Sequence, residues 1–319
     1  MNVAVVIPTY RSKSKILGVL QSIGSEVHSI YVIDDACPEQ SGDYVLSKAQ
    51  DPRIKVLRNT VNLGVGGATL HGFKAAIHDG ANILIKIDSD GQMDCRYIPK
   101  FIQLLERSNV DFVKGNRFYF LRGLRNMPWI RLLGNGALSF MTKLSTGYWS
   151  IMDPTNGFIG IKAKRLKLLD MDKIDPRYFF ETDLLFHLSM SKTPIIELYM
   201  PPLYADEKSN LSIMRSLFEF GIKHMERCFR RIFYQYFIRE VNPGSLALLA
   251  AILFNLSGFV FGIFQWHKSY ITGVPVSTGT VMFAALPIIL GVQFFIYFLQ
   301  YDAESLARAH QGVIIDSEV

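Results

Sequence analysis

Residues 83–92 decide the fold and read Ile-Leu-Ile-Lys-Ile-Asp-Ser-Asp-Gly-Gln. The run Ile83–Ile87 is mostly apolar and β-branched, as in a buried strand, and Asp88-Ser89-Asp90 follows it directly. Two carboxylates at the end of a buried strand repel each other unless a cation offsets their charge, and hard divalent ions that also bridge phosphates are the natural candidates. The stretch therefore predicts a buried strand with a cation-binding group at its carboxyl end.

Similar short runs recur on both sides of this strand and alternate with helical patterns. The other expected strands are Val3–Ile7, Ile30–Ile33, Ile54–Leu57 and Phe112–Val113. Apolar residues at helical spacing occupy Lys15–Ile23, Val65–His78 and Ile98–Glu106. Such alternation predicts an α/β domain with a mainly parallel sheet covered by helices on both faces, which binds ligands at the carboxyl ends of its strands.

Composition limits the class of protein. The chain has 319 residues, and 49% hydrophobic against 19% charged residues excludes disorder as its main state. A net charge of +6 suits nucleic acid, anionic lipid or phosphorylated substrates equally well. Three cysteines lie far apart without metal-ligand spacing, which indicates a reducing compartment and no structural zinc. A mean hydropathy of +0.19 is high for a soluble enzyme, and the excess lies at the C-terminal end.

Two long uncharged stretches account for that excess. Gly244–Trp266 is long enough to cross about 30 Å of hydrocarbon. Tyr270–Tyr301 likewise contains no charged residue and includes Val281–Leu299 as its most hydrophobic part, with Pro287 tolerable inside a bilayer. The two stretches predict a transmembrane hairpin.

The segment before the hairpin, Ser209–Val241, mixes arginines with phenylalanines and other apolar residues. This mixture is typical of amphipathic helices at a lipid interface, and the alternative is a solvated helix packed on the catalytic domain. The positive-inside rule places its basic side chains in the cytosol, and Met1–Pro8 lacks the features of a secretory signal. We therefore expect an integral protein of the inner (plasma) membrane, with a cytosolic catalytic domain (1–208), interfacial helices (209–241), two spans (242–301) and a cytosolic tail (302–319).

Further polar groups fall at the other strand ends. Pro8-Thr9-Tyr10 closes the first expected strand, Asp34-Asp35 closes the second, and Asn62–Ala68, a glycine-rich loop, opens the helix after the third. Because these positions share one edge of a parallel sheet, we expect them to converge with Asp88 on one crevice. The glycine loop lacks the third glycine of a dinucleotide fingerprint, which argues against a nicotinamide or flavin dehydrogenase.

These motifs together resemble a family 2 glycosyltransferase of the GT-A fold, in the polyprenyl-phosphate group that includes dolichol-phosphate mannose synthase and bacterial undecaprenyl-phosphate sugar transferases. The matching motifs are P-x-Y at Pro8-Thr9-Tyr10, the double aspartate at Asp34-Asp35, N-x-G-x-G-G-A at Asn62–Ala68, and D-x-D-x-Q at Asp88, Asp90 and Gln92. Further matches are Gly115-Asn116-Arg117, the loop Asp153–Phe158, and Phe179–Asp183. The resemblance covers roughly residues 1–205, and the hairpin suits members with C-terminal spans.

The resemblance implies transfer of a sugar from a UDP- or GDP-linked donor to a polyprenyl phosphate, with Mg²⁺ or Mn²⁺ held by Asp90 and Gln92. Its implied donor-binding residues are Pro8, Thr9, Tyr10, Asp35, Asn62, Gly66 and Asp88. The implied catalytic residues are Asp88, Asp90, Asp153 and Arg117, and the acceptor phosphate is expected at Arg117, Arg131 and Asn135. An ionised acceptor phosphate attacks without a strong base, and direct attack implies inversion.

The sequence departs from the family pattern at three places. Ser12 stands where many relatives have an acidic residue, Ala36-Cys37 replaces Gly-Ser after the double aspartate, and Val65 replaces the lysine of the glycine loop. The last change removes a positive charge near the donor diphosphate, so the metal ion or Arg117 is expected to neutralise more of it.

Two other functions remain open. A transferase that uses a glycan or lipid hydroxyl needs a general base, for which Asp153, Glu181 and Asp183 are the candidates. An inactive membrane scaffold is the second, and the intact Asp88, Asp90 and Gln92 argue against it. A nucleic-acid partner is not expected. Self-association through the hairpin is expected, as in tetrameric relatives.

Overall fold

The structure is a computed structural model that describes residues 1–107, 109–119, 129–201, 213–305 and 310–314. For residues 129–133, 135, 213–218 and 310–314 the backbone alone is described. Contacts divide the chain into two compact units. One consists of Met1–Arg227 and the end of the chain, and the other is Cys228–Leu306.

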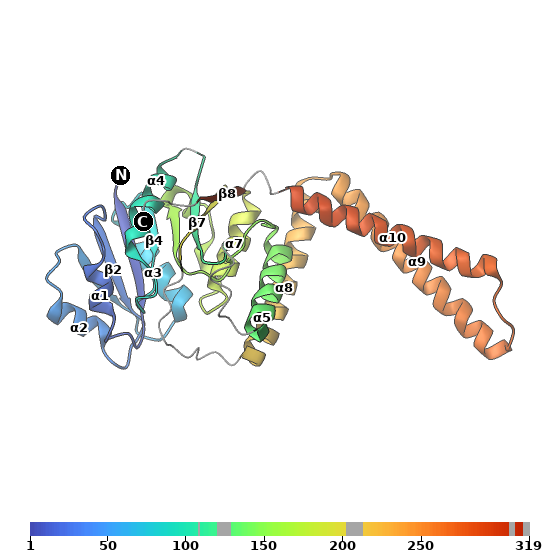
Figure 1. Cartoon of the computed structure of the whole chain (residues 1–319), viewed down its shortest axis with the longest axis horizontal. Coiled ribbons are helices and arrows are strands. Elements are labelled where there is room, and N and C mark those ends of the chain that lie inside the picture. Colours follow the sequence, from blue (N-terminus) through green and yellow to red (C-terminus); the bar gives the residue numbers. More distant parts are fainter. Residues whose placement is uncertain (108, 120–128, 202–212, 306–309, 315–319) are drawn as a thin grey trace. The chain divides into compact units, whose positions relative to one another are not determined.

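The first unit is built on one eight-stranded sheet in the order β3-β2-β1-β4-β6-β5-β7-β8 (Figure 1). Its strands are β1 (Val3–Thr9), β2 (Ser29–Asp34), β3 (Ile54–Arg58), β4 (Ile83–Lys86), β5 (Phe112–Asn116), β6 (Ile159–Lys162), β7 (Ile195–Tyr199) and β8 (His310–Ile314). Neighbouring strands are parallel except where β6 pairs antiparallel with β4 and β5. The strand order reverses between β1 and β4, and open sheets bind ligands at such a reversal.

Helices cover both faces of this sheet. They are α1 (Ile16–Gln21), α2 (Ser41–Lys48), α3 (Gly64–His78), α4 (Ile98–Glu106), α5 (Trp129–Thr146), α6 (Ala163–Leu166), α7 (Phe180–Met190) and α8 (Ile213–Phe233), with short 3₁₀ turns η1 (Cys95–Tyr97) and η3 (Met171–Lys173). Alternate β1 residues such as Val5 join a core cluster with α1, α2 and α4. A Cβ placed on Gly72 of α3 would lie 2.4 Å from Val6, so α3 packs closely on the opposite face.

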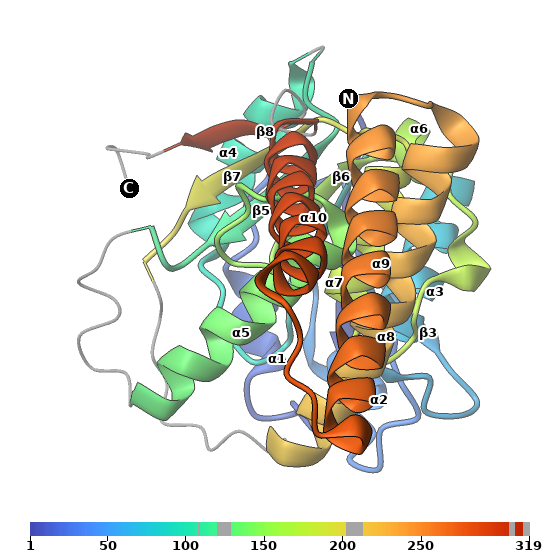
Figure 2. The ribbon, with the colours of Figure 1, turned by 90° about the vertical axis from the view of Figure 1, so that its right-hand side faces the viewer.

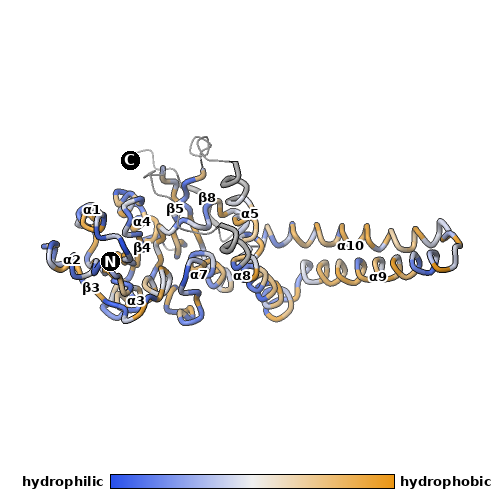
Figure 3. The backbone as a smooth tube through the Cα atoms, turned by 90° about the horizontal axis from the view of Figure 1, so that it is seen from below, coloured by the Kyte–Doolittle hydropathy of each residue, from blue (hydrophilic) through white to orange (hydrophobic). Residues whose placement is uncertain are grey.

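The second unit contains the two apolar helices, α9 (Pro243–Thr272) and α10 (Thr278–Ser305), which lie side by side (Figures 1 and 2). Asn242 caps α9 through a reciprocal hydrogen-bond pair with Ser245. Gly258 and Gly291 sit where added Cβ atoms would lie 2.7 Å from Ile288 and 2.4 Å from Asn255, so small residues let the helices approach. Apolar residues run along both helices (Figure 3), and both are long and apolar enough to cross a membrane.

A buried polar cluster lies at the base of this hairpin. It joins the end of α8 and the following π-helix η4 (Tyr234–Arg239) to the end of α10. Arg231 forms two hydrogen bonds with Asp302, at 2.6 and 2.9 Å, and Tyr236 donates a third at 2.8 Å. Because a buried ion pair is tolerated only when its hydrogen bonds are satisfied, this cluster fixes how the hairpin begins and ends.

The expected strands and helices are confirmed, with ends that shift by a few residues. The structure adds elements that the sequence pattern did not predict, among them α2, β6, β7 and the strand β8, which pairs with β7 after the hairpin. The last of these lies within the tail expected at 302–319.

Candidate active site

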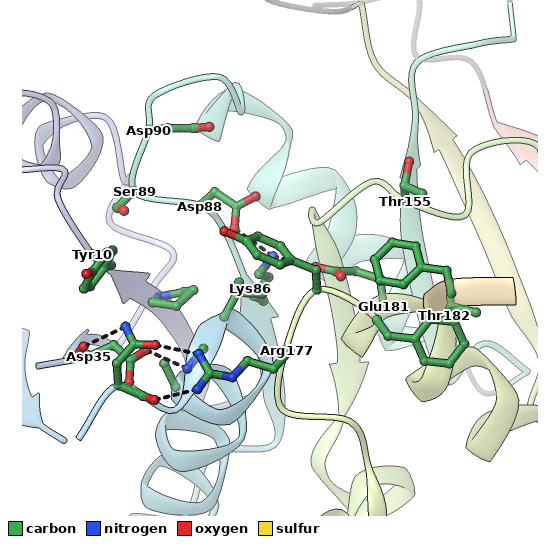
Figure 4. Close-up of a pocket in the computed structure, with 18 of the residues that line it drawn as sticks. Tyr10, Asp35, Lys86, Asp88, Ser89, Asp90, Thr155, Arg177, Glu181 and Thr182 are labelled. Carbon is green, nitrogen blue, oxygen red and sulfur yellow. Dashed lines mark hydrogen bonds and ion pairs between the residues drawn. The ribbon is translucent and has the colours of Figure 1, made fainter. Parts of the chain in front are cut away.

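A pocket of about 640 Å³ opens at the carboxyl ends of β1 and β4, where the strand order reverses. One side consists of the strand ends and the start of α3, with Tyr10, Asp35 and Asn62. The other side comes from α5, α7 and α8, and Lys86 and Asp88 lie between the two sides (Figure 4). The remaining lining residues are Pro8, Thr9, Gly64, Val65, Ala68, Ser89, Asp90, Leu138, Thr142, Thr155, Arg177, Tyr178, Phe179, Glu181, Thr182, Phe220 and His224.

The two aspartates after β2 have different roles in the structure. Asp34 accepts hydrogen bonds from the backbone N–H groups of Cys37 and Gly42, at 2.8 and 2.7 Å, and so holds its own loop. Asp35 lines the pocket and accepts from the backbone N–H groups of Leu63 and Gly64, both at 2.8 Å. Its carboxylate therefore lies at the positive end of the α3 dipole and fixes the glycine loop.

The glycines of that loop admit a second chain segment. A Cβ on Gly64, whose φ is +87°, would lie 2.7 Å from the Pro176 carbonyl and from the Arg177 side chain. Gly66 faces the Asp175 carbonyl at 2.6 Å in the same way, and the N–H of Gly67 donates to the Pro176 carbonyl at 2.9 Å. Close packing of α3 against residues 175–177 thus requires glycine here, and it brings Arg177 into the pocket.

Lys86 joins the strand end to α7. Its ammonium group is fully buried and lies 2.7 Å from Asp88 and 3.1 Å from Glu181. Burial opposes the charged form, but the two carboxylates outweigh it and raise the pKa of Lys86. Lys86 belongs to none of the sequence motifs, although a lysine within an otherwise apolar strand, two positions before Asp88, is a signal for it.

Asp90, two residues after Asp88, offers the carboxylate oxygens that a hard cation requires. Asp90 lies partly buried at the pocket wall, and burial, with the charge of Asp88, raises the pKa of its carboxyl group. The described residues contain no cluster of three His, Cys, Asp or Glu side chains that could hold a metal. Magnesium sites of this type use one or two carboxylates and take further ligands from substrate phosphates, so Asp90 fits a site that the substrate completes.

Arg117 and Asp153 lie together outside the pocket lining. The guanidinium of Arg117 donates to both Asp153 oxygens, at 2.8 and 3.0 Å, and Asp153 is fully buried. The nearby Lys114 is also fully buried and donates to the Asn156 carbonyl. The structure therefore brings this sequence-derived pair together outside the pocket lining, as an ion pair between a buried carboxylate and a partly exposed guanidinium.

Of the three candidate bases, Glu181 alone lines the pocket. Asp183 is fully buried, bonds to Arg227 at 2.6 Å and accepts the backbone N–H of Asp175 at 2.7 Å. Glu181 itself is paired with Lys86. All three carboxylates are thus held in ion pairs with cations, and none can accept a proton without losing its ion pair.

Arg131 and Asn135 lie on α5, where their side chains are outside the described residues. By helical spacing, their positions share a face with Leu138 and Thr142, which line the pocket. Gln92 follows Asp90 and donates its backbone N–H to that carboxylate at 2.9 Å.

The α5 and α8 side of the pocket is mostly apolar, with Leu138, Phe179 and Phe220 in its wall. His224 is buried beside them, 2.9 Å from the Ser145 hydroxyl, and its ring meets Phe179 edge-on. Burial lowers the pKa of His224 to about 4, so this imidazole is neutral near pH 7. The pocket therefore joins a charged end to an apolar end.

A mainly parallel sheet whose strand ends carry Asp35, Asp88 and Asp90 defines a nucleotide-sugar transferase fold. Residues 4–169 match Glycosyl transferase family 2, and the chain belongs to this family. It is a glycosyltransferase, and the expected GT-A fold is confirmed.

Curated relatives and solved structures agree with this assignment. An undecaprenyl-phosphate mannosyltransferase of Micrococcus luteus is 29% identical over 202 residues, which cover 62% of this chain and 82% of that protein. A UDP-N-acetylglucosamine–dolichyl-phosphate N-acetylglucosaminyltransferase of Methanococcus voltae is 27% identical over 217 residues, covering 63% and 85%. Glucosyl-3-phosphoglycerate synthase of Mycobacterium tuberculosis, crystallised with Mn²⁺, UDP and its product, has a TM-score of 0.53 at 16% identity over 72% of this chain and 79% of that one, a likeness of fold.

Proposed function

We propose that this enzyme transfers a sugar, with inversion and with the help of Mg²⁺ or Mn²⁺, from a nucleotide diphosphosugar to a polyprenyl phosphate at the cytosolic face of the inner membrane. The lipid-linked sugar would serve glycan or cell-envelope modification. The two curated relatives are named for undecaprenyl-phosphate and dolichyl-phosphate acceptors, which supports this acceptor class. UDP is the favoured nucleotide, and GDP is the alternative.

The observation that carries the proposal is the ion pairing of every candidate base. Asp153, Asp183 and Glu181 are held by Arg117, Arg227 and Lys86. A hydroxyl acceptor must lose a proton to a base as it attacks, whereas an acceptor phosphate is already ionised near pH 7. The pocket is thus better suited to a phosphate nucleophile than to a sugar hydroxyl.

The charged end of the pocket would bind the donor. Pro8, Thr9, Tyr10 and Asp35 would hold the nucleoside, and Asn62 would shape the wall around it. Gly66 does not line the pocket and would act by letting residues 175–177 pack on α3. Because Lys86 neutralises Asp88, this carboxylate is suited to face the sugar rather than to share the cation. A cation held by Asp90 and Gln92 would stabilise the negative charge that develops on the departing diphosphate.

The apolar end would receive the acceptor. Arg131 and Asn135 would bind its phosphate, and Arg117 would position Asp153 beneath the sugar. The first units of the polyprenyl chain would lie against Leu138, Phe179 and Phe220. This arrangement lets a lipid phosphate approach the donor while its tail remains in an apolar environment.

The surface of α8 supports a position at the membrane interface. Ile222, Met225, Phe229 and Phe233, spaced three and four residues apart, are each more than half exposed. A stripe of large apolar side chains on a basic helix is what a lipid interface would cover. The apolar helices α9 and α10 would then cross the bilayer, and tetramers could form through their exposed faces.

A transfer assay tests the proposal. The full chain in detergent is given radiolabelled UDP- or GDP-sugars, Mn²⁺ and undecaprenyl phosphate. Label should enter the lipid phase, disappear in chelator, and fall about 100-fold or more in Asp90→Ala. The exposed Asp43, paired with Arg58, provides the control Asp43→Ala, which should retain full activity. Label found on hydroxyl acceptors alone would contradict the phosphate acceptor and favour a hydroxyl acceptor. No turnover with any donor would favour the inactive membrane scaffold.

A further inference from the structure

Arg177 reaches the pocket from the segment between η3 and α7. Its two terminal nitrogens donate to the side-chain and backbone oxygens of Asn62, at 2.8 and 3.1 Å (Figure 4). Asn62 in turn donates its side-chain N–H to the Asp35 carbonyl at 3.2 Å. The guanidinium is therefore fixed at the end of the pocket that carries Asp35.

The pocket lining has an excess of acidic groups. Among the lining residues that the structure describes, Asp35, Asp88, Asp90 and Glu181 are acidic, and Lys86 and Arg177 are the two cations. A diphosphate entering this space would be repelled unless fixed positive charges lie beside its path. Lys86 cannot fill this role alone, because Asp88 and Glu181 already neutralise it.

Arg177 differs from Lys86 in its partners. Within the part of the chain that the structure describes, its guanidinium pairs with no carboxylate and bonds to Asn62 only. A guanidinium has five N–H donors, so three remain for a ligand. Arginine presents these donors as a planar fork that matches phosphate oxygens.

The fork is also held in place before any ligand arrives. The Asp175 and Pro176 carbonyls pack on Gly66 and Gly64, and the Gly67 N–H bonds to Pro176. Asp175 is in addition paired with Lys223 of α8. Because this segment is tied on both sides, little conformational entropy is lost when the guanidinium binds an anion.

We propose that Arg177 binds the diphosphate of the nucleotide-sugar donor and supplies the fixed positive charge that the glycine loop, with Val65, does not. This inference rests on the proposed donor class but not on the acceptor. The donor is favoured over the lipid phosphate as the ligand because Arg177 is anchored on Asn62 beside Asp35, whereas Leu138 and Phe220 mark the apolar end.

Binding of nucleotides without an acceptor tests the assignment. Titration calorimetry on the full chain in detergent, with Mn²⁺, compares UDP, GDP and the matching monophosphates. Arg177→Gln should weaken binding of the preferred diphosphate about 10- to 100-fold and change monophosphate binding less. Arg177→Lys keeps the positive charge but loses the planar fork of donors. Its affinity for the diphosphate should lie between those of the parent and Arg177→Gln.

Lys74→Gln is the matched control. Lys74 also ties α3 to the segment before α7, through an exposed ion pair with Asp172 at 2.5 Å, but does not line the pocket. Lys74→Gln removes one positive charge and one contact between α3 and the segment before α7, as Arg177→Gln does. Its diphosphate affinity should nevertheless equal that of the parent, because Lys74 does not line the pocket. Thermal unfolding without nucleotide shows whether each variant is folded. If Arg177→Gln is not folded, the diphosphate affinity of Arg177→Lys decides the question.

The outcomes separate the two proposals. Unchanged diphosphate affinity in the Arg177 variants overturns this inference and leaves the transfer reaction standing. A raised KM for undecaprenyl phosphate with unchanged diphosphate binding assigns Arg177 to the acceptor and also overturns it. Weakened diphosphate binding in an enzyme that fails to label undecaprenyl phosphate supports Arg177 while removing the proposed acceptor. A parent chain that binds neither UDP nor GDP overturns both.

Discussion

Two lysines, Lys86 on β4 and Lys114 on β5, are fully buried, and their surroundings affect them in opposite directions. Direct contact with Asp88 and Glu181 raises the pKa of Lys86. Burial lowers the pKa of Lys114 to about 8, although the more distant charges of Asp153, Glu181 and Glu197 oppose this shift. A direct ion pair thus keeps one lysine charged, whereas the other is close to neutral at mildly alkaline pH.

Lys114 gives a pH-dependent stability. An unfolded lysine has a pKa of about 10.4, so between pH 8 and about 10.4 the unfolded state binds more protons than the folded state. The free energy of unfolding should therefore rise with pH across this window by about 3 kcal/mol relative to a chain without this group. Comparing Lys114→Met with the parent isolates the effect, because all other titrating groups are shared.

Thermal unfolding in detergent from pH 7.5 to 10.5 measures this difference. The midpoint of the parent minus that of Lys114→Met should increase by about 5 to 10 °C over the range. A difference that stays constant with pH would show that Lys114 titrates normally, and one that falls would show that it is held charged by its acidic neighbours.

For single residues, the sequence predicted which side chains directly after a strand lie at the pocket. It did not predict the side chains whose position depends on contacts with distant parts of the chain. Tyr10, Asp35, Asp88 and Asp90 line the pocket as expected, because strand ends in a parallel sheet meet at one edge. Arg177 reaches Asn62 across 115 positions of sequence, and no local pattern encodes that contact. The ion pair that draws Arg117 away from the pocket lining is likewise a long-range contact, with Asp153.

Among the elements, the contact of α3 with the segment before α7 depends on the glycine loop. An added Cβ on Gly66 would lie 2.6 Å from the Asp175 carbonyl and 2.7 Å from Phe180. Backbone and a buried ring cannot easily shift, so the two elements would have to separate. That movement would also displace Arg177 from Asn62.

Gly66→Ala should consequently destabilise the first unit by about 1 to 3 kcal/mol and weaken diphosphate binding. Gly18 in α1 is the control, since nothing lies within 4 Å of its added Cβ. Gly18→Ala should leave binding unchanged and stabilise the helix by about 0.5 to 1 kcal/mol. Chemical or thermal unfolding with nucleotide titration checks both, and equal behaviour of the two variants would refute the close-packing argument.

The predicted elements were those with a strong apolar period, such as β1, β2 and α3. β6 is four residues long, contains Gly160 and runs antiparallel between β4 and β5, so its identity depends on its neighbours more than on its own pattern. The short helix α2 has three buried residues, Ser41, Gly42 and Val45, of which only Val45 is a large apolar residue. Elements of this kind are fixed by tertiary packing, which overrides weak local preference.

For the whole molecule, the strand β8 has a topological consequence. β7 pairs in parallel with β8, which follows α10 in the chain, so the chain before and after the hairpin belongs to one sheet. A single sheet lies on one side of a membrane, and the number of crossings between β7 and β8 must therefore be even. Two spans satisfy this condition, and one does not.

Cysteine labelling in intact cells tests this membrane topology. Ser277, exposed between α9 and α10, and Lys48, exposed at the end of α2, are replaced singly by cysteine. Ser277→Cys should react with a membrane-impermeant maleimide added outside, and Lys48→Cys only after permeabilisation, because the proposed topology puts the hairpin turn and the catalytic domain on opposite faces of the membrane. The native Cys37 and Cys95 are buried and Cys228 is partly buried, so the parent chain, labelled in the same way, measures the background. If both introduced cysteines become accessible only after permeabilisation, α9 and α10 do not cross the bilayer, and the apolar surface they expose must be covered by another partner.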